Sequence, residues 1–179
     1  MKSLSYLAII TTLTLISCSP QLRSLTKSLY VNSGLTESEL GNLQFYLSEE
    51  VTLYRRSQSK KSAIENGSIK IVKGQQIEEV VFPKGTPGLF VNKIDGDKLA
   101  ISFDSNQDAI LIFGPNPKYS DRYVVLAKDW KNGIGKITYG SNNFNITAQS
   151  ATAGLLLDIK HLDQSSRSRT TVQGNRLDD

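Results

Sequence analysis

The sequence predicts a mainly β protein, a small antiparallel barrel or sandwich with one N-terminal α-helix. Many short runs rich in β-branched and aromatic residues follow one another at roughly 8–12-residue spacing, with turn residues between them. Only one stretch combines a helix start signal with apolar residues at helical spacing, and no later stretch keeps that period for three turns. This order of elements is typical of an antiparallel sheet protein and not of a parallel α/β fold.

The predicted helix runs from about Glu37 to Ser48. Thr36 and Glu39 form a capping box, in which each side chain satisfies a backbone N–H of the first helical turn. Gly41 lies inside the range and weakens the helix by roughly 1 kcal/mol. Leucines follow the capping box at helical spacing, at Leu40, Leu43 and Leu47. Their apolar stripe is expected to pack on the sheet.

Strands are predicted from Val51 onward, where alternation replaces the helical period. Asp95-Gly96 suits a tight hairpin turn, because both of its residues tolerate positive φ, and Asn132-Gly133 marks a further turn. The predicted strands are Val51–Arg55, Ser68–Val72, Ile77–Phe82, Leu89–Ile94, Leu99–Phe103, Ala109–Phe113, Tyr123–Ala127, Ile134–Tyr139, Phe144–Thr147 and Leu155–Ile159.

The first 18 residues have the layout of a cleavable leader. A positive start is followed by the apolar run Leu4–Ile16, which is too short for the ~20-residue helix that crosses a bilayer. Small Ser17 then precedes Cys18, the only cysteine of the chain. The alternatives are an ordinary secretory signal and a buried N-terminal helix with an incidental thiol.

Leu15-Ile16-Ser17-Cys18 resembles the lipobox of bacterial lipoproteins. The resemblance implies cleavage between Ser17 and Cys18 by a type II signal peptidase, a diacylglycerol thioether on Cys18 and acylation of the new amine. Ser19 stands where an aspartate retains some lipoproteins in the inner membrane. By this resemblance we expect a lipid-anchored protein of the bacterial outer membrane that faces the periplasm.

Four segments are expected: a signal peptide over 1–17, a tether over 18–35, a β-rich globular domain over 36–162 and a disordered polar tail over 163–179. A chain of 179 residues is long enough for one domain with a sizeable core. Its formal net charge is only +4 and its basic residues are scattered, which disfavours nucleic acid as a partner.

No catalytic residues, metal site or cofactor are predicted. The sequence has no G-x-S-x-G elbow and no nucleotide-binding glycine loop, and its one histidine, His161, lies beside the tail. The segment Asp104–Asp108 matches the start of a calcium loop, but Ala109 replaces the required glycine and Pro115 the required glutamate. We therefore interpret this segment as a polar hairpin loop.

Two groups of residues are candidate binding sites. Arg55, Arg56, Lys60 and Lys61 form a basic loop that could meet anionic lipid headgroups or peptidoglycan carboxylates, although solvated surface charge is the simpler interpretation.

Four aromatic residues form the second group, because they surround the predicted turn Lys128–Gly133. Such aromatics can stack on sugars or grip peptides, or they can close the rim of the core. The residues are Tyr119, Tyr123, Trp130 and Tyr139.

Together these features predict a membrane-anchored envelope lipoprotein that acts as a non-catalytic binding or structural module. Its expected partners are the membrane, through the acyl chains on Cys18, and an envelope protein or peptidoglycan or other glycan. The alternatives are an accessory of an envelope hydrolase, for which His161 is the candidate group, and a periplasmic inhibitor. An inhibitor would present a protruding loop, with Gly85–Gly88 or Lys128–Gly133 as candidates.

Overall fold

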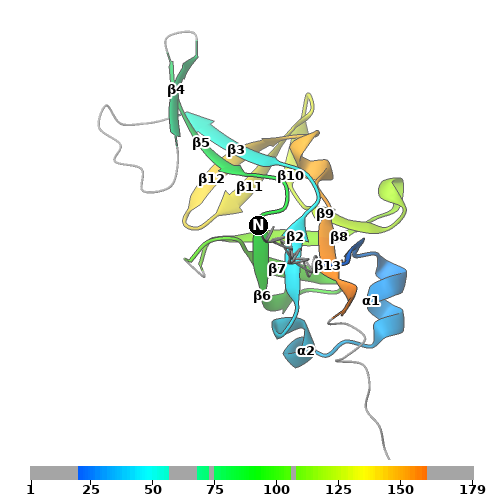
Figure 1. Ribbon diagram of the computed structural model, residues 1–179. Coiled ribbons are helices and arrows are strands. Elements are labelled where there is room, and N and C mark those ends of the chain that lie inside the picture. The colour runs from blue at the N-terminus through cyan, green and yellow to red at the C-terminus, as the bar shows by residue number, and fades with distance from the viewer. Residues whose placement is uncertain (1–19, 57–67, 73–74, 106–107, 161–179) are drawn as a thin grey trace, which may run out of the picture.

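The computed structural model of the chain describes residues 20–56, 68–72, 75–105 and 108–160 (Figure 1). These residues form two antiparallel sheets that share one hydrophobic core, which confirms the mainly β class. No helix in this part of the chain is long and apolar enough to cross a membrane.

One sheet has seven strands and contains both the first and the last strand described. Its spatial order is β1 (Leu22–Ser24), β13 (Leu155–Asp158), β2 (Gln44–Leu47), β6 (Pro87–Ile94), β7 (Lys98–Ser102), β8 (Ile110–Asn116) and β9 (Arg122–Val125).

The second sheet has six strands. Its spatial order is β10 (Lys128–Lys131), β11 (Ile134–Tyr139), β12 (Asn142–Thr147), β3 (Val51–Arg56), β5 (Gln75–Phe82) and β4 (Ser68–Val72). The chain therefore crosses between the sheets several times, including the short connection from β9 to β10.

The two edges of the seven-stranded sheet approach each other without forming a closed barrel. Only isolated bridges join them, between Thr26 and Arg122 and between Val124 and Gly154. Of the two predicted architectures, the sandwich is therefore the one that fits. Each predicted strand overlaps an observed one, whereas β1, β2 and β10 were not predicted.

The predicted helix Glu37–Ser48 is wrong in its second half. The helix α2 covers only Glu37–Gly41, and the chain then turns into β2, Gln44–Leu47. The capping box itself is present, since the Thr36 N–H donates to Glu39 Oε2 at 2.8 Å. Beyond Gly41 the backbone finds hydrogen-bond partners on both sides, in β13 and β6, so the sheet replaces the helix.

The described part of the predicted tether 18–35 also belongs to the folded body. It contains β1 and a second helix, α1 (Lys27–Ser33), which begins at the N-cap Thr26. Leu25 is completely buried and Tyr30 nearly so. The signal peptide 1–17, Cys18 and the predicted tail 163–179 lie outside the described residues.

The core draws completely buried apolar side chains from both sheets: Phe45, Leu53, Leu111, Phe113, Ile146 and Leu155. One tyrosine of the core is buried together with its hydroxyl group. Tyr123 on β9 is fully buried, with its ring centroid 5.8 Å from that of Tyr30 in an edge-to-face contact. Its hydroxyl has no hydrogen-bond partner within the described residues. Burial raises the pKa of this phenol well above its ordinary value, as does the nearby Asp97.

We predict that Tyr123→Phe raises the free energy of unfolding by about 1 kcal/mol, because it removes a buried hydroxyl that pays a desolvation cost without a compensating bond. Urea unfolding measures the change. Tyr139→Phe is the matched control, because the Tyr139 hydroxyl donates to Asp104 and its removal should destabilise. A Tyr123→Phe variant that loses as much stability as this control would contradict the prediction.

Candidate functional site

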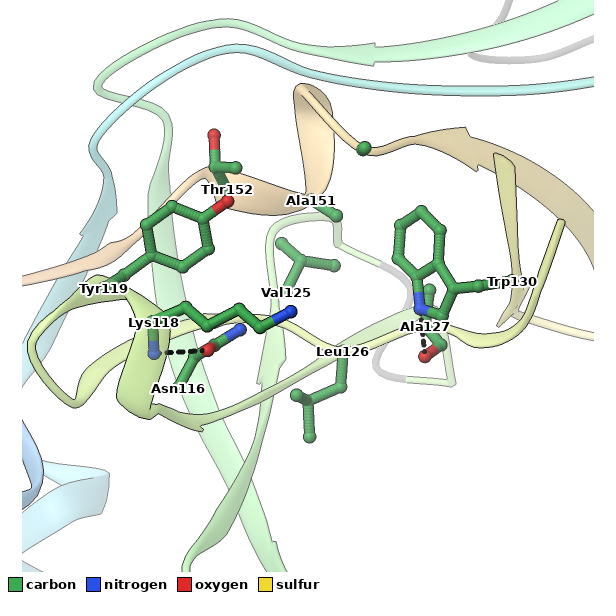
Figure 2. Close-up of a pocket in the computed structure, with 10 residues that line it drawn as sticks. Asn116, Lys118, Tyr119, Val125, Leu126, Ala127, Trp130, Ala151 and Thr152 are labelled. Atoms are coloured by element: carbon green, nitrogen blue, oxygen red, sulfur yellow. Dashed lines mark hydrogen bonds between the residues drawn. The ribbon is translucent and has the colours of Figure 1, made fainter. Parts of the chain in front are cut away.

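A pocket of about 330 Å³ opens where the chain crosses from β9 in one sheet to β10 in the other (Figure 2). Its floor is apolar, with Val125 and Ala151 at the centre, and polar and aromatic side chains stand around it. The described residues that line it are Asn116, Lys118, Tyr119, Val125, Leu126, Ala127, Trp130, Ala148, Ala151 and Thr152.

Trp130 forms one wall of the pocket and is held in place although it is 47% exposed. Its indole N–H donates to the Ala127 carbonyl oxygen at 3.0 Å. Its ring also lies so close to Gly135 of β11 that a Cβ added there would be 3.0 Å from two ring atoms. The predicted turn Asn132-Gly133 joins β10 to β11, and both of its residues have positive φ. The hairpin thus presents a fixed aromatic face.

Tyr119 stands at the opposite end of the pocket (Figure 2). It ends a short 3₁₀ helix, Pro117–Tyr119, whose N-cap Asn116 accepts the backbone N–H of Lys118 through Oδ1 at 3.0 Å. Arg122 fixes the end of this turn, because its Nε donates to the Tyr119 carbonyl oxygen at 3.2 Å. Its guanidinium carbon lies 6.0 Å from the centroid of the Tyr119 ring.

Lys118 is the one side chain among the described lining residues that carries a charge at neutral pH. Its chain runs along the pocket between the two aromatic walls (Figure 2). No ion pair involving Lys118 occurs in the part of the chain that the structure describes. The pocket therefore combines two aromatic walls, an apolar floor and one positive charge.

The four predicted aromatic residues do not form one site. Tyr119 and Trp130 line the pocket described above, whereas Tyr123 is a core residue. Tyr139 lies in a second pocket, of about 490 Å³, and is only 8% exposed.

The second pocket is acidic where the first is basic. Its described lining includes Glu78, Asp104 and Asp108. Within the described residues, no group of three or more histidine, cysteine or acidic side chains could hold a metal ion. The calcium-like segment Asp104–Asp108 joins β7 to β8, as expected of a hairpin loop.

The surroundings of Tyr139 in this second pocket raise the pKa of its phenol. Burial raises the pKa of its phenol to about 12, assisted by the negative charge of Asp104 and by the hydrogen bond to Asp104 Oδ2 at 3.5 Å. An unfolded tyrosine loses its proton near pH 10, so above that pH the unfolded chain binds fewer protons than the native one. The stabilising contribution of Tyr139 is therefore complete below pH 10 and is lost as the pH rises to about 12.

The unfolding free energy of the wild type declines between pH 10 and about 12, and we predict that this decline is less steep in Tyr139→Phe. The slopes of the two proteins should differ by less than the value that corresponds to the uptake or release of one proton. Urea unfolding at a series of pH values measures this slope. Tyr46→Phe, which changes a half-buried tyrosine of β2, is the control. Parallel pH profiles for wild type and Tyr139→Phe would contradict the prediction.

Only half of the predicted basic loop lies among the described residues, where Arg55 and Arg56 belong to the strand β3. Arg55 makes two hydrogen bonds to the Glu78 carboxylate, of 2.6 and 3.1 Å, and its guanidinium carbon lies 4.9 Å from the Phe144 ring centroid. Arg55 is thus engaged within the sandwich, and Arg56 is exposed at the end of β3. Lys60 and Lys61 lie outside the described residues.

The residues of the alternative functions are placed only in part. The loop Gly85–Gly88, a candidate for an inhibitory loop, is held against β2, because the Gly85 N–H donates to the Leu47 carbonyl oxygen at 2.8 Å. The other candidate, Lys128–Gly133, is the strand β10 with its hairpin turn. His161, proposed for hydrolase chemistry, lies outside the described residues.

Sequence reasoning missed the polar residues of the pocket. Asn116 and Lys118 belong to one turn, and only the fold brings Thr152 close to them. The one local signal was Asn116-Pro117, which is typical of the start of a helical turn. No family model, curated protein or solved structure matches this chain.

Proposed function

We propose that this protein is a lipid-anchored module of the bacterial envelope that binds a ligand, without converting it, in the pocket between Tyr119 and Trp130. The observation that carries the proposal is that the Trp130 side chain is both exposed and held in one position. Its indole is 47% exposed, and it is fixed by the hydrogen bond from its N–H to Ala127 and by its close contact with Gly135. A fixed, open aromatic face is suited to ligand contact, because little conformational entropy is lost when the ligand binds.

The lining of the pocket favours binding over catalysis. Nucleophilic catalysis usually needs a nucleophile with an activating base within hydrogen-bond reach of it. The described lining residues include no carboxylate, thiol or imidazole. The lysine, the amide and the aromatic rings that are present recognise a ligand by charge, hydrogen bonding and stacking.

The place of action follows from the lipobox. Cys18 is the proposed acylation site, which would keep the sandwich at the periplasmic face of the outer membrane. Peptidoglycan, other glycans and envelope proteins lie within its reach there. A module of this kind would attach the membrane to the peptidoglycan, or would keep a bound glycan or envelope protein at the membrane.

Site-specific photo-crosslinking in native envelopes tests the proposal. A photoreactive phenylalanine analogue replaces Tyr119 at the pocket, and in a control chain it replaces Val31, which is 59% exposed on α1. We expect an envelope component to be captured from position 119 and not from position 31. Trp130→Ala should abolish the capture. Equal capture from both positions, or capture that survives Trp130→Ala, would contradict the proposal.

A further inference from the structure

We infer that the ligand of this pocket is an anionic saccharide, with a sugar ring stacked on Trp130 and its negatively charged substituent at Lys118. The inference rests on the proposed binding function and specifies the chemistry of the ligand. It follows from the hydrogen-bonding groups that the pocket leaves available, from its charge and from the form of its aromatic wall.

The pocket offers more donors than acceptors. Asn116 Oδ1 already accepts the Lys118 backbone N–H, which leaves one lone pair of this oxygen and both hydrogens of the side-chain NH₂ for a ligand. Lys118 adds an ammonium group with donors only. Thr152 gives its proton to the Gln149 carbonyl oxygen at 2.7 Å, and its oxygen remains as an acceptor. A ligand that matches this set is rich in acceptors.

The pocket is also positively charged. None of its described lining residues is acidic, and Lys118 has no ion pair with any described residue. Lys128 and Lys131, both exposed, flank Trp130 on β10, where Asp129 is the one acidic residue. An anion therefore gains a charge-assisted hydrogen bond at Lys118 and is attracted by the surrounding field.

The aromatic wall favours a sugar over a peptide. The face of an indole ring is electronegative and attracts the C–H groups that line one side of a sugar ring. An extended peptide would instead add to the free edge of β10 through backbone hydrogen bonds. That edge is irregular, because the β10–β11 register shifts between Lys128 and Lys131 and Asp129 has a φ of 52°. The interrupted edge cannot continue a regular ladder.

Trp130 is the only tryptophan of the chain, so its fluorescence reports directly on the pocket. The full-length protein in detergent is titrated with N-acetylmuramic acid and with N-acetylglucosamine, which differ by one carboxylate-bearing ether. We expect the acid to bind about tenfold more tightly, the effect of one charge-assisted hydrogen bond. Added NaCl should reduce this preference. A titration with N-acetylglucosamine 6-phosphate shows whether a phosphate group raises the affinity as the carboxylate does.

Two variants with a matched control locate the effect. Lys118→Gln should remove the preference for the acid, so that this variant binds the acid and N-acetylglucosamine with equal affinity. Lys84→Gln, which alters an exposed lysine paired with Glu49 at 3.5 Å, should change neither affinity. Trp130→Ala should lose binding of all the sugars, which calorimetry measures because this variant has no tryptophan.

Equal affinities for the acid and the neutral sugar, or a preference that survives Lys118→Gln, would overturn the inference and leave the binding function in place. Binding of triglutamate without any sugar would overturn it in favour of an acidic peptide. If no probe binds while crosslinking from Tyr119 persists, the ligand class is wrong. If that crosslinking also fails, the proposed function falls with it.

Discussion

Replacing Cys18 by alanine is expected to abolish incorporation of labelled fatty acid. At ~0.8 kcal/mol for each buried CH₂ group, two long acyl chains contribute on the order of 20 kcal/mol of membrane affinity. Cys18 is the only thiol of the chain that could carry them, so we expect an all-or-none loss of label, measured by metabolic labelling.

Ser19→Ala is the matched control for this experiment, because it changes the neighbouring residue and leaves the thiol in place. It should be labelled like the wild type. Undiminished labelling of Cys18→Ala would show that the lipobox interpretation is wrong. A native protein that mass spectrometry finds to begin at Met1 with a free thiol would show the same.

Phe45→Ala is expected to lower the free energy of unfolding by about 3–5 kcal/mol, the usual cost of removing a large buried aromatic side chain. Phe45 is completely buried on β2, which lies between β13 and β6 within the seven-stranded sheet. Its register partners are Leu157 on one side and Gly88 on the other. The cavity would therefore open in the middle of the sheet, where the backbone cannot easily move to fill it.

The neighbouring residue provides the control for this prediction. Tyr46 points to the other face of β2 and is half-buried, so Tyr46→Ala should cost clearly less. In the helix first predicted here, Leu43 and Leu47 would face the core and Phe45 would lie on the far side. Urea unfolding that finds Phe45→Ala no more costly than Tyr46→Ala would contradict the strand.

Local chemistry was sufficient to predict most of the sheets. Runs such as Ile134–Tyr139 alternate between exposed and buried positions as predicted. The pair Asn132-Gly133 adopts positive φ at both residues, which a tight hairpin requires. At Asp95-Gly96 only the glycine does so, because that turn has a third residue, Asp97. Turn residues therefore located the hairpins better than they specified their geometry.

The missed strands depend on distant partners. Leu22–Ser24 is short and largely exposed, and it is a strand because β13 pairs with it from the other end of the sequence. Gln44–Leu47 continues the leucine spacing of the helix before it, and only its two neighbouring strands decide the outcome. Lys128–Lys131 has no buried side chain to mark an inner face. The sequence pattern of these segments alone does not show that distant strands will pair with them.

Only some residues of the candidate pocket could be predicted, because the position of the others also depends on distant partner strands. An aromatic residue beside a polar hairpin turn pointed to Trp130, and Tyr119, which was grouped with it, lines the same pocket. Tyr123 and Tyr139 carry the same kind of side chain, but their strands turn them into the core and into another pocket. Which face a strand residue takes depends on register, and register is set by the partner strand.

The pairing of β1 with β13 places the two ends of the described chain together. The Ile159 N–H donates to the Gln21 carbonyl oxygen at 3.1 Å, and the Gln21 N–H donates to Asp158 Oδ1 at 3.2 Å. A reporter domain fused directly after residue 160 would thus be joined to the sandwich within one strand spacing of the segment that leads to Cys18. The same adjacency makes the chain suited to circular permutation, because a short peptide could connect residue 160 to residue 20 without crossing the body.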